Sequence, residues 1–392
     1  MTRPAEPVLV VGAGPVGLLL AARLCALGVS TRLIERRPGP RRGSRAIGIH
    51  PPGLSALASV GADVAVRAAG VRIVEGLAFG ANGPLGTLRF DDDTPVLAVP
   101  QAETETALLG ALAASGGVVE WGVRLEGLEP AADGDVTATL ASAQGAQRAP
   151  VRLVLGCDGR DSRVRALAGI GRRGGPYPDR YLMADLPDAG RLGPRAEIRL
   201  HREGLVESFP LPGGWRRVVV RAGGEAAAPG TAGLRPVDPA LAQRVCDLAA
   251  ARGAGRFDPG RARMTSAFGV ERWLAGRFAA GPVALAGDAA HVVSPIGGQG
   301  MNLGWLDALA LATAVADGLA SGPAALEAAL AAYAARRRRA ARRALWRAEW
   351  NMRLGRPLSP LQARARDALL AQALRPPWSG SLVGAFTMRG LA

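Results

Sequence analysis

The strongest chemical signal in this chain is a carboxylate that ends an apolar run and precedes a glycine-rich turn. Residues 281–307 read GPVALAGDAAHVVSPIGGQGMNLGWLD, so the strand expected over 283–286 ends at Gly287 and Asp288. A carboxylate accepts hydrogen bonds from neighbouring hydroxyl groups, which suits Asp288 to hold a polyol chain. The glycines of the turn at 295–300 then let main-chain N–H groups face negative charge at the start of a long apolar helix.

A second glycine-rich turn lies near the N-terminus. The strand expected over residues 7–11 is followed by Gly-Ala-Gly-Pro-Val-Gly at 12–17 and by a helix expected over 18–27. A further strand over 31–34 then ends at Glu35. A strand, a glycine turn, a helix, a strand and an acid within roughly thirty residues are typical of a dinucleotide-binding unit.

Each residue type in this unit has a physical role. Gly12 permits the tight turn, Gly14 lets a pyrophosphate approach the backbone, and Gly17 allows close packing of helix and strand. Glu35 can accept hydrogen bonds from both hydroxyls of an adenosine ribose. These features do not distinguish FAD from NAD.

A third segment combines an acid and a glycine after a buried strand. The strand expected over residues 151–155 leads into Gly-Cys-Asp-Gly-Arg-Asp-Ser at 156–162. Asp158 and Gly159 therefore end a strand beside the predicted cofactor, and Ser162 can cap the following helix. Either Arg160 or Arg165 can contact a phosphate or brace Asp158.

The order of these three segments resembles the group A flavoprotein monooxygenases, the p-hydroxybenzoate hydroxylase-like aromatic hydroxylases. The resemblance implies that the bound dinucleotide is FAD. It also implies that Asp158 and Gly159 serve both FAD and the pyridine nucleotide, and that Arg45, in a Ser-Arg-Ala-x-Gly segment, and Gln101 lie near FAD. The predicted cofactor contacts are Gly12, Gly14, Pro15, Val16, Gly17, Glu35, Arg36, Arg45, Gln101, Asp158, Gly159, Arg165, Gly287, Asp288, Pro295, Gly298, Gly300, Met301 and Asn302.

The resemblance also implies an activity. In that family NADPH or NADH reduces FAD, O2 adds at flavin C4a, and the hydroperoxide transfers a hydroxyl group to an electron-rich aromatic substrate. Main-chain N–H groups from Gly298 onward would stabilise the anionic reduced flavin, and Pro295 would help to keep water out. A base assists a phenolic substrate, and His201, on an expected strand, is a candidate. His291 is expected to bond the local backbone, and His50 is open to either a structural or a catalytic role.

The basic residues after Glu35 admit two interpretations. Arg36, Arg37, Arg41 and Arg42 can select NADPH through its 2′-phosphate, because guanidinium matches phosphate geometry. The alternative is a solvated basic loop in an arginine-rich protein.

The predicted fold class is α/β, with a Rossmann-type, glutathione-reductase-like FAD domain interleaved with a smaller mixed-sheet substrate domain. Stretches 71–99 and 181–221 alternate apolar and polar residues and predict antiparallel strands. The resemblance implies that these strands combine into one sheet, and 238–252 predicts a helix on it. The expected FAD domain comprises 1–72, 98–176 and 265–345. The substrate domain comprises 73–97 and 177–264, and a helical C-terminal segment covers 346–392.

Composition bounds the remaining choices. The chain has 392 residues, 48% hydrophobic, with a net charge of +15 in which all 48 cationic side chains are arginine. The arginines are scattered and aromatics reach only 4%, so we expect no nucleic-acid partner. We expect no metal, no apolar run able to span a membrane, no membrane association, a cytoplasmic location, and a monomer or homodimer.

Other activities share the predicted fold. A flavin-dependent halogenase is disfavoured, because this chain lacks both a lysine and a Trp-x-Trp-x-Ile-Pro signature. An epoxidase or Baeyer–Villiger oxygenase and a geranylgeranyl-reductase-type enzyme remain alternatives. A membrane-docked flavin-binding protein that uses the arginine-rich helix at 324–350 is the non-enzyme alternative. An aromatic polyketide is one substrate class compatible with the predicted hydroxylation.

Overall fold

The computed structural model describes residues 7–40, 47–90, 95–131, 134–188, 190, 192–223 and 237–391. Its helices are α1 Pro15–Ala26, α2 Pro51–Ala58, α3 Asp63–Ala69, α4 Gln101–Ala114, α5 Arg163–Leu167, α6 Pro239–Ala251, α7 Gln299–Ser321, α8 Pro323–Leu354, α9 Pro360–Ala373 and α10 Ser379–Phe386, with short 3-10 turns η2 Pro259–Arg261 and η3 Gly287–Ala289. Its strands are β1 Val8–Val11, β2 Thr31–Glu35, β3 Gly48–Ile49, β4 Val71–Ile73, β5 Glu75–Gly80, β6 Gly83–Arg89, β7 Val96–Ala98, β8 Val119–Trp121, β9 Arg124–Pro130, β10 Val136–Ser142, β11 Gly145–Val151, β12 Leu153–Gly156, β13 Arg172–Pro187, β14 Arg195–His201, β15 Gly204–Leu211, β16 Trp215–Ala222, β17 Met264–Ala275, β18 Ala279–Ala280, β19 Val283–Leu285 and β20 His291–Val292.

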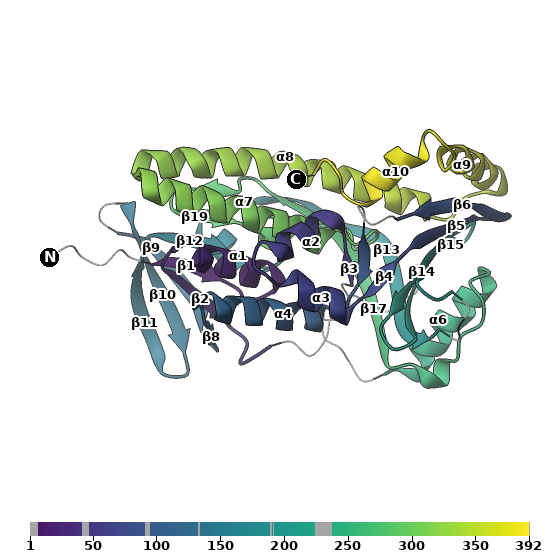
Figure 1. The fold of residues 1–392 in the computed structure, drawn as a ribbon, viewed down its shortest axis with the longest axis horizontal. Helices are drawn as coiled ribbons and strands as arrows, with labels where there is room; N and C mark the ends of the chain where they lie inside the picture. Colours follow the sequence, from purple (N-terminus) through teal and green to yellow (C-terminus); the bar gives the residue numbers. More distant parts are fainter. Residues whose placement is uncertain are drawn as a thin grey trace.

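The first layer is a mostly parallel sheet with the order β18-β19-β12-β1-β2-β8. Its central strands β1 and β12 are buried along their whole length, as expected for a parallel sheet covered on both faces. Helices α1, α4 and α7 lie alongside it, and the β9–β10–β11 sheet extends from one end (Figure 1). The predicted strand–turn–helix–strand order at the N-terminus is confirmed.

The second layer is an eight-stranded sheet with the order β20-β17-β13-β16-β15-β14-β5-β6. It joins β5 and β6 of the first predicted stretch to β13–β16 of the second, whereas β4 and β7 of the first stretch pair with each other, and β7 with β3, in a separate three-stranded sheet. One expectation was wrong, because β5 and β14 pair in parallel, although the other pairs of this sheet are antiparallel. The chain leaves this sheet after β6 and returns to it at β13, and β14 then lies beside β5, so the two stretches are not joined by a hairpin.

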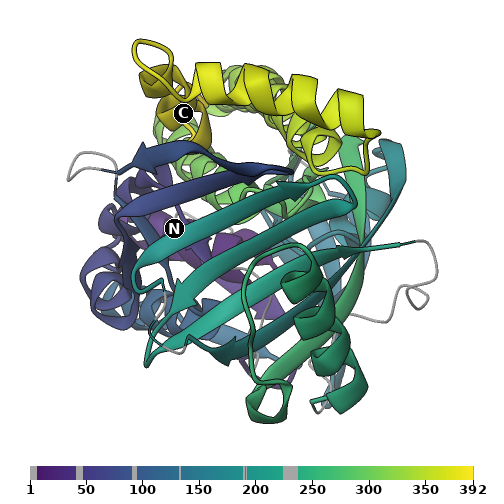
Figure 2. The same cartoon turned by 90° about the vertical axis from the view of Figure 1, so that its right-hand side faces the viewer.

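The two faces of the eight-stranded sheet have different neighbours. One face carries Leu182, Ala184, Val218 and Val220 and packs against α6, which crosses it in Figure 2. Helix α6 begins as predicted, because the Asp238 carboxylate accepts the N–H groups of Ala240 and Leu241 at 3.0 and 3.1 Å. The opposite face meets Ile296 of the glycine-rich turn and Met352 of α8.

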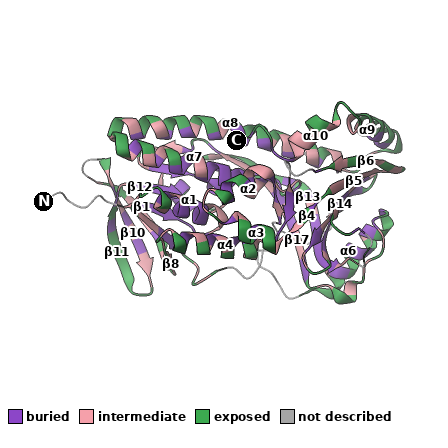
Figure 3. Ribbon diagram, viewed as in Figure 1, coloured by how far each residue is buried: buried purple, intermediate pink, exposed green. Residues whose placement is uncertain are grey.

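Helices α7 to α10 form the predicted helical C-terminus. Helix α8 lies along α7 and continues to the eight-stranded sheet, where α9 and α10 meet β6 (Figure 1). By length and composition α7 is apolar enough to cross a membrane, contrary to our expectation that no run would be. Its apolar side packs against α1, α2 and α8, which explains that composition within this fold, and burial is concentrated where these helices meet the sheet (Figure 3).

The expected domain borders remain a prediction. Strand β13 begins at Arg172 and β17 spans Met264–Ala275, so both cross the borders drawn near residues 176 and 264. The described chain nonetheless passes from the first sheet to the second and back, as an interleaved fold requires.

Candidate functional site

The N-terminal glycine turn is set by close backbone contacts. Gly12 has a φ of +103°, and a Cβ there would lie 2.6 Å from the carbonyl oxygen of Cys157. A Cβ on Gly17 would lie 1.8 Å from the carbonyl oxygen of Gly12, so α1 can approach β1 only with glycine at that position. Gly14 caps α1 and faces open space, with no side-chain cap on the helix. Pro15 has no N–H, so the N–H groups of Val16 and Gly17, which have no acceptor within the helix, leave an anion-binding end at α1.

Glu35 closes this unit through Arg37. Its carboxylate accepts the Ala13 N–H at 2.9 Å and the Nε–H of Arg37 at 3.0 Å. Burial raises the pKa of Glu35, but the hydrogen bonds and charge of Arg37 outweigh burial and hold it below its usual value. Arg37 also donates to the Ala13 carbonyl at 3.2 Å, whereas Arg36 is exposed. Glu35 therefore stays ionised beside the glycine turn, while Arg37 is committed to the turn itself.

Asp158 and Arg165 organise the segment that faces this turn. Asp158 accepts the backbone N–H of Arg163 at 2.6 Å and that of Val164 at 3.0 Å, and its buried Oδ1 has no hydrogen-bond partner among the described residues. Ser162 caps α5 as predicted, because its hydroxyl accepts the Arg165 N–H at 2.9 Å. The Arg165 guanidinium donates to the carbonyls of Ala289 and Arg160, each at 2.9 Å. Arg165 thus ties this segment to the one that follows Asp288, and Gly159 is left with a φ of +83°.

Asp288 is the exposed acid in the segment 281–307. It lies in η3, beside α1, because a Cβ on the preceding Gly287 would be 3.0 Å from Val16 Cγ2. Its side chain is exposed, although desolvation by the surrounding protein raises the pKa of its carboxyl. Among the described residues none donates a hydrogen bond to it, although the charges of His291 and Arg160 act on it. Such a carboxylate can accept hydroxyl groups of a ligand.

The start of α7 presents a second uncapped helix N-terminus. Gly297 and Gly298 have φ values of +89° and +65°, and Gly298 caps the helix without a side-chain hydrogen bond. Asn302 holds this turn: it donates to the carbonyls of Gly48 and Gly298 at 3.0 and 2.9 Å and accepts the His50 N–H at 2.9 Å. The half-buried Gly300 and Met301 complete the first turn. Its N–H groups can face negative charge.

His50 supports the same turn from the other side. Its Nε2 lies 3.1 Å from the Gly297 carbonyl, and its ring meets Phe386 edge-on at a centroid distance of 5.4 Å. Burial lowers the pKa of His50 to about 4, so the ring is neutral and donates from Nε2 near neutral pH. The structure therefore gives His50 a positioning contact, the first of its two predicted roles.

A buried ionic network lies under Gly287 and Asp288. Asp307 of α7 receives the Nε–H of Arg337 at 2.7 Å, the Gly287 N–H at 3.1 Å, and a 2.5 Å contact from His291 Nε2. All three side chains are fully buried. Our expectation that His291 bonds the backbone was wrong, because its Nε2 faces the Asp307 carboxylate. The network fixes Gly287 and thereby aims Asp288.

Ile296, next to the predicted Pro295, packs the glycine-rich turn against the eight-stranded sheet. Pro295 is exposed, whereas Ile296 is buried and joins the cluster of Tyr181, Met183 and Val219 on the eight-stranded sheet. Ile296 is thus the described residue that connects the turn to that sheet, and the role predicted for Pro295 remains a prediction.

Three further predicted residues lie apart from these contacts. Half-buried His201 ends β14 at the hairpin turn, where its Nδ1 accepts the Glu203 N–H at 3.3 Å. Gln101 donates to Glu105, one turn along α4, at 2.7 Å. Arg45, like Arg41 and Arg42, lies outside the described residues. Cofactor and catalytic roles for these residues remain predictions.

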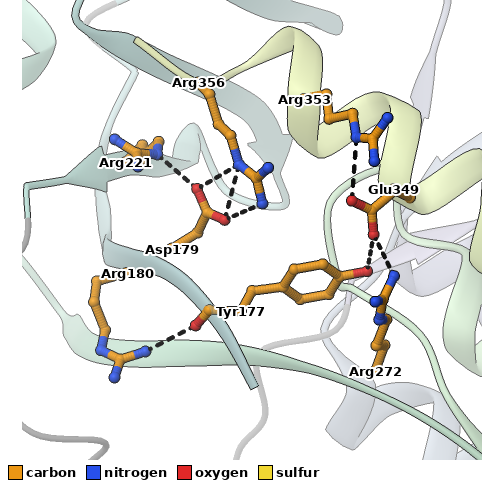
Figure 4. A network of polar contacts seen from close by, with 8 residues as sticks. All are labelled: Tyr177, Asp179, Arg180, Arg221, Arg272, Glu349, Arg353 and Arg356. Carbon is orange, nitrogen blue, oxygen red and sulfur yellow. Dashed lines mark hydrogen bonds and ion pairs between the residues drawn. The ribbon is translucent and has the colours of Figure 1, made fainter. Parts of the chain in front are cut away.

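A polar clamp fastens α8 to the eight-stranded sheet (Figure 4). A register irregularity in β13 lies between Pro176 and Arg180 and includes Tyr177 and Asp179. The buried Asp179 carboxylate binds Arg221 of β16 at 2.9 Å and Arg356, just after α8, at 2.8 Å. Tyr177, Arg272 and Arg353 all donate to Glu349 of α8, at 2.8, 2.7 and 3.2 Å; Arg180 bonds the Tyr177 carbonyl at 3.3 Å.

Sequence reasoning missed Asp307, Arg337, Ile296 and the clamp. Asp307 did carry a signal, because it is the lone acid in the apolar stretch GWLDALALA, where a charge needs a partner. Its partner lies 30 residues away, and spacing alone does not identify it.

Comparison with known proteins gives a consistent picture. A family model described as "FAD binding domain" matches residues 5–348. The chain is 34% identical over 317 residues to the 6-methylpretetramide 4-monooxygenase of Streptomyces rimosus, a match that covers 78% of this chain and 54% of that protein. The chain thus spans little more than half the length of that curated relative.

Solved structures resemble the chain over nearly its full length. The p-nitrophenol 4-monooxygenase of Pseudomonas putida superposes with a TM-score of 0.85 at 24% identity, covering 97% of each chain, and shows a shared fold. Aklavinone-11 hydroxylase, solved in a ternary complex with FAD and aklavinone, superposes with a TM-score of 0.74 at 25% identity, covering 93% of this chain and 71% of that one.

Proposed function

The chain belongs to the FAD-binding domain family, and on that premise we propose that it is an FAD-dependent monooxygenase that hydroxylates an aromatic or polycyclic small molecule with NAD(P)H and O2. Relatives named for oxidation of tetracycline-type polyketides and of pentachlorophenol support this substrate class. An aromatic polyketide is the proposed substrate within it.

One observation carries the proposal. The exposed Asp288 carboxylate accepts no hydrogen bond from the described residues and lies beside the uncapped N-terminus of α1. The uncapped N-terminus of α7 follows Asp288 in the same segment, 281–307. A dinucleotide with a pyrophosphate, a polyol chain and a ring that gains negative charge requires these three features in this order.

The residues present therefore fit FAD. Gly14 and the first turn of α1 would hold the pyrophosphate, Glu35 the adenosine ribose, and Asp288 the ribityl hydroxyls. FAD, when bound, supplies the chemistry that accepts a hydride from NAD(P)H and activates O2. The N–H groups after Gly298 would stabilise negative charge at the ring, and Ile296 would exclude water from the side facing the sheet.

The finer parts of the proposal concern the donor, assembly and location. We propose NADPH or NADH as donor, a monomer or homodimer, a cytoplasmic location, and neither membrane nor nucleic acid as a partner. Epoxidation or Baeyer–Villiger oxygenation would use the same cofactor site, and a saturating reductase would use it without transferring oxygen. Product analysis under ¹⁸O2 distinguishes the oxygenases from the reductase, because only an oxygenase incorporates the label, and the bonds of the labelled product distinguish hydroxylation from epoxidation and Baeyer–Villiger oxygenation.

The first experiment is flavin binding by the purified protein and its Asp288→Ala variant. The lost interactions are hydrogen bonds to a charged group, worth about 1.5–3 kcal/mol, so FAD affinity should fall about 10- to 100-fold. Asp317→Ala, which removes an exposed acid further along α7, is the control and should bind FAD normally. NADPH oxidation should then rise in wild type when a planar phenol or aromatic polyketide is added. Equal FAD affinity in both variants would contradict the assignment of Asp288.

A further inference from the structure

Two buried polar groups on the eight-stranded sheet have no partner among the described residues. The Tyr181 hydroxyl is buried, and no described residue forms a hydrogen bond with it. Glu207 is 5% exposed, and no described residue forms a hydrogen bond or ion pair with its carboxylate. A buried polar group without a partner costs about 1–3 kcal/mol, and an ionised one costs more. Two such groups on one sheet indicate that something outside the described chain satisfies them.

The strand register places both groups on the same face. Val219 of β16 lies opposite Met183 of β13 and opposite Glu207 of β15. Tyr181 is two residues from Met183, so its side chain shares that face. Phe268, opposite Tyr181 on β17, stacks on its ring at 5.8 Å between centroids. Tyr181 and Glu207 therefore stand among apolar and aromatic side chains.

This face of the sheet packs against the glycine-rich turn at residues 295–300. Ile296, which precedes Gly297 and Gly298, belongs to the same buried cluster as Tyr181, Met183 and Val219. The opposite face is filled by α6 and presents neither group. The face that carries Glu207 is thus the one beside the proposed flavin turn.

The surrounding charges do not neutralise Glu207. Burial alone raises the pKa of its carboxyl to about 8. The other described charged or titratable groups around this face are tied to one another: Arg217 to Asp185, Arg221 and Arg356 to Asp179, Arg272, Arg353 and Tyr177 to Glu349, and Arg366 to Asp367 and the Leu200 carbonyl. Glu207 can therefore exchange a proton with a group that enters beside it.

We propose that Tyr181 and Glu207 bind a free hydroxyl group of the aromatic substrate and that the Glu207 carboxylate takes its proton. The substrate O–H bond breaks, a new O–H bond forms on Glu207, and the electron pair stays on the substrate oxygen. The oxygen then donates electron density to the ring, which favours attack on an electrophilic oxygen, and Tyr181 donates a hydrogen bond to it. Glu207 returns the proton to the product oxygen or to water. This inference rests on the proposed function and restricts the substrate to a planar aromatic with a free hydroxyl group.

The test uses the FAD-loaded protein with 2-naphthol, whose neutral and ionised forms absorb differently. Ionised Glu207 should bind it best, so affinity measured by calorimetry should rise about tenfold between pH 7 and pH 9, with the naphtholate band in difference spectra. Glu207→Gln should bind it more weakly and show no such rise. Tyr181→Phe should weaken binding and keep the rise. 2-Methoxynaphthalene, which has no proton to give, should bind wild type and Glu207→Gln alike.

The matched control is Glu197→Gln. Glu197 is a buried glutamate on the neighbouring strand β14, its register with Ser208 places it on the opposite face, and it is paired with Arg199 at 2.5 Å. It should keep the wild-type pH profile. The inference is overturned if 2-naphthol does not bind wild type, if it binds no better than the ether, or if Glu207→Gln keeps the rise. FAD retention and turnover with ¹⁸O2 measure the proposed function separately, so it can stand if the inference falls.

Discussion

Two buried acids in this molecule have opposite surroundings. The Asp307 carboxylate, under Gly287 and Asp288, contacts the side chains of Arg337 and His291 and accepts the Gly287 N–H, so the protein itself supplies these partners. Glu207, on the eight-stranded sheet, receives none from the described residues. Burial raises the pKa of both carboxyls, but at Asp307 the contacts with His291 and Arg337 outweigh burial and lower it. The comparison teaches that a satisfied buried charge builds the scaffold, whereas an unsatisfied one marks where a ligand acts.

The largest expected effect is the loss of folding stability when Asp307 is replaced. Asp307→Asn leaves Arg337 buried without a counter-charge, and breaking a buried pair in this way costs about 3–5 kcal/mol. Urea unfolding monitored by circular dichroism should show this loss, and FAD affinity should fall because Gly287 loses its anchor. Asp317→Asn, an exposed acid on the same helix, should change stability by less than about 0.5 kcal/mol. Equal stability of the two variants would break the comparison.

The contribution of Glu207 to folding stability should depend on pH. The pKa of Glu207 is about 8 in the fold and about 4.3 in an unfolded chain, so the folded state holds its proton longer. The contribution of Glu207 is therefore greatest below pH 4.3 and is lost as the pH rises to about 8, at up to ~1.4 kcal/mol per pH unit.

Removing this titration tests the assignment without any substrate. Glu207→Gln should gain stability relative to wild type as the pH rises from 5 to 8, and the difference should level off above that. Urea midpoints at one-unit intervals measure it. A constant difference between the two proteins would mean that Glu207 has a partner in solution.

A smaller effect is expected at His50, which supports the glycine turn. His50→Ala removes the contact with the Gly297 carbonyl and the edge-on contact with Phe386, a loss of about 2 kcal/mol. FAD affinity should fall several-fold, as measured by flavin fluorescence. His201→Ala, at a half-buried hairpin turn, should leave FAD affinity unchanged. If both variants lose flavin equally, the turn is not what His50 holds.

The sequence predicted features that depend on local residue order and missed features that depend on contacts between distant elements. Gly12, Gly17 and Asp288 were found because their roles depend on local order: a turn, a close approach, and an acid after a strand. Asp307, Ile296 and Glu207 were missed because their roles depend on pairings between distant strands and helices. The parallel pairing of β5 with β14 was missed for the same reason, since alternation of apolar and polar residues does not encode strand direction.

The smallest expected effect lies in the clamp, where exposure varies among neighbouring ion pairs. Arg353→Ala removes a pair with Glu349 in which the arginine side chain is 58% exposed, and such pairs contribute about 0.2–0.5 kcal/mol. Arg356→Ala should cost more, because Asp179 is fully buried and keeps only Arg221. Thermal unfolding should rank Arg356→Ala below Arg353→Ala, with Arg353→Ala close to wild type. The reverse ranking would mean that exposure, which distinguishes the buried Asp307 from the surface acid Asp317, does not set the cost of losing an ion pair in the clamp.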